Sequence, residues 1–228
     1  ITMVCCWSSP LYFLLLTLAW HDQWLIAFSL LSAYWFVRFL DGVWLDAQGR
    51  TKFLYGGAVM LGLAGLCKYT AVFVGISVFG IIVQQPKFRK LLQDRRLYGA
   101  IAIALLITLP ILIWNLQNNW LSFQYYLTRS VDSGGGSTLK PGEVLFFWLL
   151  AALILSPPLV WALVRSVRLR TALKSPTFST LALGLFLTST GALSLLGLFS
   201  TALYYWNVLA YLLLLPLLPL FFLAPDSG

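Results

Sequence analysis

Charged side chains are scarce in this sequence. Asp, Glu, Lys and Arg make up only 10% of the 228 residues, against about a quarter in a typical soluble domain. There are seven acidic residues and a single histidine. A soluble chain of this length needs polar side chains to cover its surface, so the composition excludes a soluble globular enzyme. It also excludes a disordered segment, because such segments have low hydrophobicity.

Several kinds of site lack their residues as well. The cysteines Cys5, Cys6 and Cys67 show no CxxC or Cys/His spacing, which indicates neither a zinc site nor a disulfide framework. The sequence has no P-loop, GxGxxG, HExxH or GxSxG motif, and no visible carboxylate pair for acid–base catalysis. Nucleotide-driven transport within this chain is therefore not expected.

Long apolar runs dominate what is present. Hydrophobic residues make up 60% of the chain, and the mean hydropathy is +0.87. A helix needs about 20 apolar residues to cross a bilayer, and spans must be helical because lipid offers no partner for a backbone amide. The sequence therefore predicts an all-α, polytopic membrane protein that forms one multi-pass domain over residues 1–228. Eight spans are predicted, at 1–20, 24–40, 53–67, 70–85, 97–114, 144–164, 177–198 and 202–223.

The basic residues predict the orientation of these spans. Most of the 15 lie in three segments between apolar runs, at 38–52, 87–96 and 165–174. Cytoplasmic loops carry an excess of Lys and Arg, so we expect these segments and both ends of the chain to be cytoplasmic. The outer face then carries residues 21–22, 68–70 and 115–143. Nucleic acid is not an expected partner, because the charges do not form one stripe.

Small residues and prolines predict how the helices pack. Ala58, Gly62 and Gly65 share one face of the third span, which allows close approach of a neighbouring helix. Prolines within or near the spans are expected to bend or break them, and the pair Pro157–Pro158 is the expected site of a kink. The prolines concerned are Pro110, Pro157, Pro158, Pro216 and Pro219.

Two polar positions on the outer face are candidates for chemistry. Asp22 follows His21 at a predicted turn; its carboxylate could bind a metal, a sugar hydroxyl or a basic group, or simply be solvated. Lys68 ends an apolar span; its ammonium could extend to the interface, or it could meet a phosphate that arrives from the lipid. The hydroxyls of Tyr69 and Thr70 would suit such a phosphate.

The loop after Trp114 is rich in aromatic and amide side chains. Trp120, Phe123 and Leu127 have the spacing of a short amphipathic helix in the membrane interface. Amide side chains both donate and accept hydrogen bonds, which suits sugar hydroxyls, and an arginine can grip a phosphate with two hydrogen bonds. The candidates here are Asn115, Gln117, Asn118, Trp120 and Arg129.

Two stretches carry a family resemblance, GLAGLCKYT at 62–70 and LPILIWNLQNNWLSF at 109–123. With them, roughly residues 10–215 resemble the polyprenyl-phosphate-sugar glycosyltransferases of the protein-mannosyltransferase and aminoarabinose-transferase type (glycosyltransferase family 39, GT-C fold). The pair Tyr205–Trp206 partly matches a late His–Trp pair of that family. Two family histidines are replaced, by Asn118 and Tyr205. The family's first outer loop has no counterpart, so we expect a fragment that lacks the first helix and that loop.

The resemblance implies a reaction and its participants. A sugar leaves a polyprenyl phosphate on the outer face of the cytoplasmic membrane, with inversion, and joins a lipid, glycan or protein acceptor. Lys68 and Arg129 would stabilise the leaving phosphate, an electrostatic role. Asp22 would be an assisting acid, with the main catalytic acid upstream of this chain. Tyr69, Asn115, Gln117, Asn118, Trp120, Tyr205 and Trp206 would contact substrate, and a divalent metal (Mg or Mn) is optional.

Two other functions remain as alternatives. A transporter or flippase component would place ionisable residues within the spans, along a path, whereas all seven acidic residues fall outside the predicted span cores. A catalytically silent membrane scaffold would explain the missing catalytic acid. An upstream segment with an acidic outer loop would favour the enzyme.

Overall fold

The computed structural model describes residues 21–42, 50–124, 139–168, 176–199 and 204–219, and in these residues all regular structure is helical. The predicted all-α class is confirmed. The α-helices are α3 (His21–Asp41), α4 (Arg50–Cys67), α5 (Val72–Gln84), α6 (Arg95–Gln117), α8 (Pro141–Leu155), α9 (Pro157–Arg168), α10 (Pro176–Gly197) and α11 (Val208–Leu214). Short 3-10 helices join them: η2 (Tyr69–Ala71), η3 (Pro86–Gln93), η5 (Tyr204–Asn207) and η6 (Leu215–Leu217).

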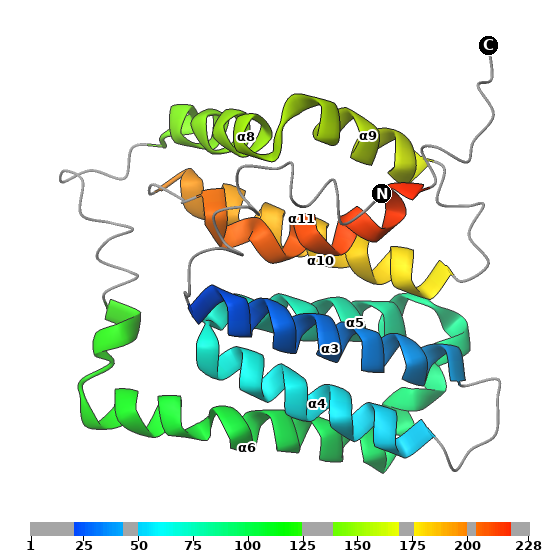
Figure 1. Cartoon of the computed structure of the whole chain (residues 1–228). Helices are drawn as coiled ribbons and strands as arrows, with labels where there is room; N and C mark the ends of the chain where they lie inside the picture. The colour runs from blue at the N-terminus through cyan, green and yellow to red at the C-terminus, as the bar shows by residue number, and fades with distance from the viewer. Residues whose placement is uncertain (1–20, 43–49, 125–138, 169–175, 200–203, 220–228) are drawn as a thin grey trace.

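The helices stack side by side with their axes in one general direction (Figure 1). Helices α4 and α6 lie at one side of the stack, α3 and α5 next to them, then α10 and α11, and α8 with α9 at the other side. The predicted spans from 24–40 to 177–198 each coincide with a helix or a helix pair, and the described part of the span at 202–223 holds η5, α11 and η6. The span predicted at 1–20 lies outside the described residues.

Some of the described helices are long and apolar enough to cross a membrane on their own. Three described helices pass alone, at Asp22–Asp41, Arg95–Gln117 and Pro176–Gly197, and two bent pairs would pass if each is one span. Thr51–Cys67 and Val208–Leu217 are apolar but shorter. The described residues thus support a polytopic membrane protein, and the number of eight spans stays a prediction.

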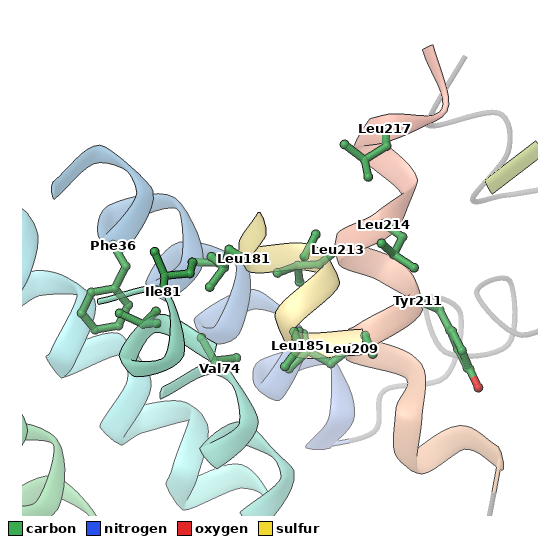
Figure 2. Packing of buried hydrophobic residues seen from close by; sticks show 14 of the residues in the cluster. Phe36, Val74, Ile81, Leu181, Leu185, Leu209, Tyr211, Leu213, Leu214 and Leu217 are labelled. Atoms are coloured by element: carbon green, nitrogen blue, oxygen red, sulfur yellow. The ribbon is translucent and has the colours of Figure 1, made fainter. Parts of the chain in front are cut away.

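The core lies between the two halves of the stack. Leu181 and Leu185 of α10 pack with Val74 and Ile81 of α5 and with Leu213 of α11, and all of these side chains are buried (Figure 2). By contrast α6 leaves Leu105 and Leu106 exposed at 58% and 65%. A helix with so little buried surface faces lipid or another protein.

Glycines bring α4 and α6 into close contact, as predicted. A Cβ at Gly62 would lie 2.7 Å from the Cβ of Ile107 and 3.1 Å from the carbonyl oxygen of Ala104. A Cβ at Gly65 would lie 2.8 Å from the Cγ2 of Thr108. The absence of side chains on this face is what permits the approach.

The prolines behave in two ways. Helix α8 ends at Leu155, and the next residue, Ser156, has φ 74°. Helix α9 starts at Pro157, with a bend of 95° between the two helices. The kink predicted at Pro157–Pro158 is confirmed. Pro110, in contrast, lies inside the continuous helix α6, so it does not break the helix there. A proline removes only one helix hydrogen bond, and membrane helices tolerate that loss through local adjustment.

Basic residues gather at one end of the stack. Helix η3 is bent by 109° from α5, with Phe88 fully buried beneath it and Lys87, Arg89 and Lys90 exposed. The segment 86–96 and the C-terminal end of α9 lie at this same end, and the N-terminal ends of α3 and α8 lie at the opposite one (Figure 1). We call the first the basic end and the second the opposite end.

Candidate functional site

A buried ion pair at the opposite end joins two of the predicted site residues. The Nζ atom of Lys68 donates to the Oδ1 atom of Asp22 at 2.7 Å. The side chains are only 13% and 2% exposed. The alternative of a solvated loop carboxylate at Asp22 is therefore wrong, and Lys68 is held by a carboxylate rather than extended into water. The two residues are 46 positions apart in the sequence. They meet because the N-terminal end of α3 lies beside the C-terminal end of α4.

Local structure explains how each partner is placed. Asp22 stands in the first turn of α3, where the positive end of the helix dipole favours a carboxylate. Lys68 is the N-cap of η2 with extended backbone (φ −163°, ψ 140°), so the chain leaves α4 there and turns. Its own amide still closes the last turn of α4 on the carbonyl oxygen of Ala64, at 3.0 Å.

The turn after Lys68 supplies an aromatic ring and a hydroxyl. The ring of Tyr69 stacks on that of Phe123 with centroids 5.4 Å apart and an interplanar angle of 19°. Trp120 lies against Phe123 as well, at 5.6 Å. The hydroxyl oxygen of Thr70 is buried without a hydrogen-bond partner in the described structure. Such a group costs about 1–3 kcal/mol, so an incoming acceptor there would be stabilising.

Asn115 and Asn118 use their amides to fold the loop back onto η2. Asn115 is fully buried; its Nδ2 donates to the carbonyl oxygen of Ile111 at 2.9 Å, and its Oδ1 accepts from the amide of Ser122 at 3.2 Å. The Nδ2 of Asn118 donates to the carbonyl oxygen of Trp114 at 2.7 Å. These contacts give both side chains a structural role, whatever they also contact. Gln117 is exposed at the end of α6.

The backbone reverses sharply in this loop. Asn119 and Trp120 have positive φ values of 52° and 58°, and the amide of Trp120 donates to the carbonyl oxygen of Asn115 at 2.7 Å. A short helical turn then covers residues 121–124. Of the predicted amphipathic helix, residues 121–124 are helical and Trp120 precedes them, while Leu127 lies outside the described residues.

An apolar groove runs from this site along three helices. It encloses about 550 Å³ between α4, α5 and α6. Tyr69 and Phe123 line one end, and Leu54, Ile82 and Leu97 line the other. The groove thus extends for most of the length of these helices, from Tyr69, the residue after Lys68, towards the basic end.

Comparison with known protein families shows which family the chain belongs to. The model of the dolichyl-phosphate-mannose-protein mannosyltransferase family matches residues 1–114, half of the chain. The chain belongs to this family. The match includes the Asp22–Lys68 pair and most of the groove. No curated protein and no solved structure matches the chain.

Membership gives this mannosyltransferase-family protein its general function. It is a membrane glycosyltransferase, which takes a sugar from a lipid-linked donor and passes it to an acceptor. The apolar helices agree with a membrane location.

Other predicted site residues of this glycosyltransferase lie elsewhere. Trp206 packs against Phe147 and Leu193, between α8 and α10. Tyr205 belongs to η5, and its side chain lies outside what the structure describes, as does all of Arg129. In the described part of the chain no three His, Cys, Asp or Glu residues cluster to hold a metal, so the optional Mg or Mn site stays a prediction without a ligand set.

Sequence reasoning missed a buried polar cluster beside Trp206. Asn207 is 1% exposed; its Oδ1 accepts from the Oγ of Ser189 at 2.6 Å, and its Nδ2 donates to the Oγ1 of Thr190 at 2.7 Å. Hydrogen bonds of this kind join helices within a membrane. The only available signal was an isolated amide between two apolar runs.

Proposed function

We propose that this protein transfers a sugar from a polyprenyl-phosphate donor to an acceptor on the outer face of the cytoplasmic membrane, with inversion. The observation that carries the proposal is the buried Lys68–Asp22 pair, which lies directly before Tyr69, a residue that lines one end of the apolar groove. A polyprenyl phosphate has the same two parts, an anionic head and a long apolar chain. The groove would hold the chain, and the opposite end of the stack would face outward.

The residues around η2 suit the phosphate. The ammonium of Lys68 supplies a positive charge in a nearly dry environment, where electrostatic stabilisation of a leaving group is strongest. The hydroxyl of Thr70 supplies a donor that otherwise lacks a partner in the described structure. We propose Arg129 as a second cation.

The chemical step follows from these roles. The oxygen of the acceptor forms a bond to the anomeric carbon from the face opposite the phosphate, and the bond from that carbon to the phosphate oxygen breaks. The electron pair stays on the phosphate, beside Lys68. The acceptor proton passes to a carboxylate base. Asp22 assists by holding Lys68 in place and by offering its second oxygen to a sugar or acceptor hydroxyl.

Transfer of label from a radiolabelled polyprenyl-phosphate sugar in membranes tests this function. We expect transfer with the wild type and a loss of at least about 100-fold in Lys68→Ala, because an electrostatic contact to the leaving group is removed. Lys90→Ala, which changes an exposed lysine at the basic end, should keep full activity. Lys68→Arg keeps a positive charge beside Asp22, so it should fold and keep more activity than Lys68→Ala; equal losses in the two variants would mean that the charge is not what matters.

The alternatives predict different results. A transporter or flippase component would move the labelled lipid across the membrane without transfer to an acceptor, and a silent scaffold would do neither. If transfer survives in Lys68→Ala at equal protein levels, the enzyme stands but the phosphate is bound elsewhere.

A further inference from the structure

A second pocket lies on the other half of the stack, away from the groove. It encloses about 280 Å³ between α8, α9, α10 and α11. Its walls are almost entirely apolar, with Trp148 and Ala152 from α8, Val164 from α9 and Phe186 from α10. This volume suits part of one acyl chain rather than a whole sugar–lipid donor, because drug-sized ligands take roughly 300–1,000 Å³.

A cation marks one end of this second pocket. Arg168, the last residue of α9, lines it and is exposed, and Arg165 lies one turn earlier. The C-terminal end of α9 is at the basic end of the stack, the side of residues 86–96 (Figure 1). Basic pockets between membrane helices on the cytoplasmic side typically bind the headgroups of anionic lipids.

A buried hydroxyl marks the interior of the pocket. Tyr211 of α11 lines it and is 5% exposed; its hydroxyl oxygen makes no hydrogen bond of ordinary geometry in the described structure, and its polar neighbour is the side chain of Asn207. The ring points away from Leu185 and Leu209 of the core (Figure 2). An orphaned hydroxyl in an apolar site is costly, so an acceptor that enters the pocket would be favoured there.

We propose that this pocket binds an anionic phospholipid, with one acyl chain between α8, α9, α10 and α11 and the phosphate headgroup at Arg168. The hydroxyl of Tyr211 donates to an oxygen of the same lipid. Charge selects an anionic lipid over a zwitterionic one, and the apolar walls select a chain over a soluble phosphate. The site is independent of the groove and of the glycosyl-transfer reaction.

Lipid titration tests the proposal. Purified protein in detergent is titrated with phosphatidylglycerol or phosphatidylcholine, and bound lipid is counted by native mass spectrometry. We expect the wild type to bind phosphatidylglycerol at least about fivefold more tightly, and Arg168→Gln to lose that preference, since one arginine near a headgroup contributes about 1 kcal/mol. Arg95→Gln, the same change at another exposed arginine of the basic end, should keep the preference.

Two further variants separate the pocket from the charged surface. Ala152→Trp fills the pocket and should lower the binding of both lipids several-fold. Tyr211→Phe should weaken phosphatidylglycerol binding about threefold without lowering the unfolding temperature in lipid-free detergent. Equal affinity for the two lipids overturns the proposal, and so does an equal loss in Arg168→Gln and Arg95→Gln. Unchanged binding in Ala152→Trp also overturns it, because the lipid would then lie outside the pocket.

Discussion

A single carboxylate at the start of α3 determines the character of the candidate site. Asp22 is almost completely buried, and the cost of burying a charge is tolerable only with a partner in contact. Lys68 is that partner, at 2.7 Å. The lysine is therefore held in position before any substrate arrives, which favours a fixed rather than a mobile phosphate contact.

We predict that substitutions of Asp22 and Lys68 have strongly non-additive effects on the free energy of unfolding. Asp22→Asn and Lys68→Met should each cost about 3 kcal/mol, because each leaves an uncompensated buried charge. The double variant should cost clearly less than the sum of the two, since no lone charge then remains. Thermal unfolding in detergent measures all three.

An exposed lysine serves as the control for these three variants. Lys90→Met should change stability by no more than about 0.5 kcal/mol. Strict additivity of Asp22→Asn and Lys68→Met would show that the pair does not form in the folded protein.

The sequence identified Asp22 and Lys68 as candidates but did not predict their pairing. Contact between residues 46 positions apart depends on how α3 and α4 cross, and hydropathy does not encode that. The amides of the 114–124 loop show a second limit. Asn115 suited a sugar by residue type, yet its side chain serves the backbone of a turn with positive φ at Asn119 and Trp120. Residue type alone did not distinguish these roles.

At the scale of elements, the contact of α4 with α6 forms one wall of the groove. Gly62 and Gly65 line the groove and also allow α6 to approach. A side chain here would act on packing and on groove width together. The small-residue pattern was visible in the sequence because it repeats on one helix face.

We predict that Gly62→Ala destabilises the protein by about 1–3 kcal/mol, because its Cβ would lie 2.7 Å from the Cβ of Ile107 and the helices must separate. Gly191→Ala in α10 is the matched change, since a Cβ there would meet no atom within 4 Å beyond its chain neighbours and the backbone of its own helix. It should leave stability unchanged or raise it by up to about 1 kcal/mol. Unfolding temperatures of the two variants in the same detergent check this, and equal effects would count against the close α4–α6 contact.

At the bend between α8 and α9, we predict a substitution that raises stability, in contrast to Gly62→Ala. Ser156 has φ 74° and ψ 130°, a conformation that costs a residue with a Cβ atom about 1–3 kcal/mol. Ser156→Gly should therefore raise stability by about 1 kcal/mol. Ser166→Gly, in the last turn of α9, should lower stability, because glycine is unfavourable within a helix and the hydrogen bond from the Oγ of Ser166 to the carbonyl oxygen of Ala162 is lost.

The two proline sites, Pro157–Pro158 and Pro110, show what sequence can predict about such bends. Pro157 and Pro158 follow a serine that can leave the helical conformation, and the chain turns there. Pro110 lies in the middle of a long apolar helix, where neighbouring residues keep the helix continuous. Proline indicates where a hydrogen bond is missing, and the surrounding structure decides whether the helix bends.

At the scale of the whole molecule, hydropathy predicted the helices well because lipid leaves the backbone no other solution. Each predicted span from 24–40 to 177–198 has its helix or helix pair, and the described part of the last one holds α11 between two 3-10 helices. The packing order of the helices was not predictable, because apolar side chains that face lipid and those that face protein look alike in sequence. The groove and the second pocket are both products of that packing.

Orientation in the membrane gives the last prediction. In a background with Cys5, Cys6 and Cys67 replaced by alanine, Gln117→Cys and Lys90→Cys place one thiol at the opposite end and one at the basic end. A membrane-impermeant maleimide should label Gln117→Cys in intact cells and Lys90→Cys only after permeabilisation, because the basic end is expected to be cytoplasmic. Leu105→Cys, on the exposed apolar face of α6, should remain unlabelled in both cases.

Each labelling pattern has a direct consequence for the site. Outward labelling of Gln117→Cys places the Lys68–Asp22 pair at the leaflet where we propose transfer, and it places Arg168 beside the anionic cytoplasmic leaflet. The reverse pattern would move the ion pair to the cytoplasm, so the donor would have to be presented there and the proposed outer-face reaction would fail. Labelling of both thiols in intact cells would mean that the described helices do not separate two compartments.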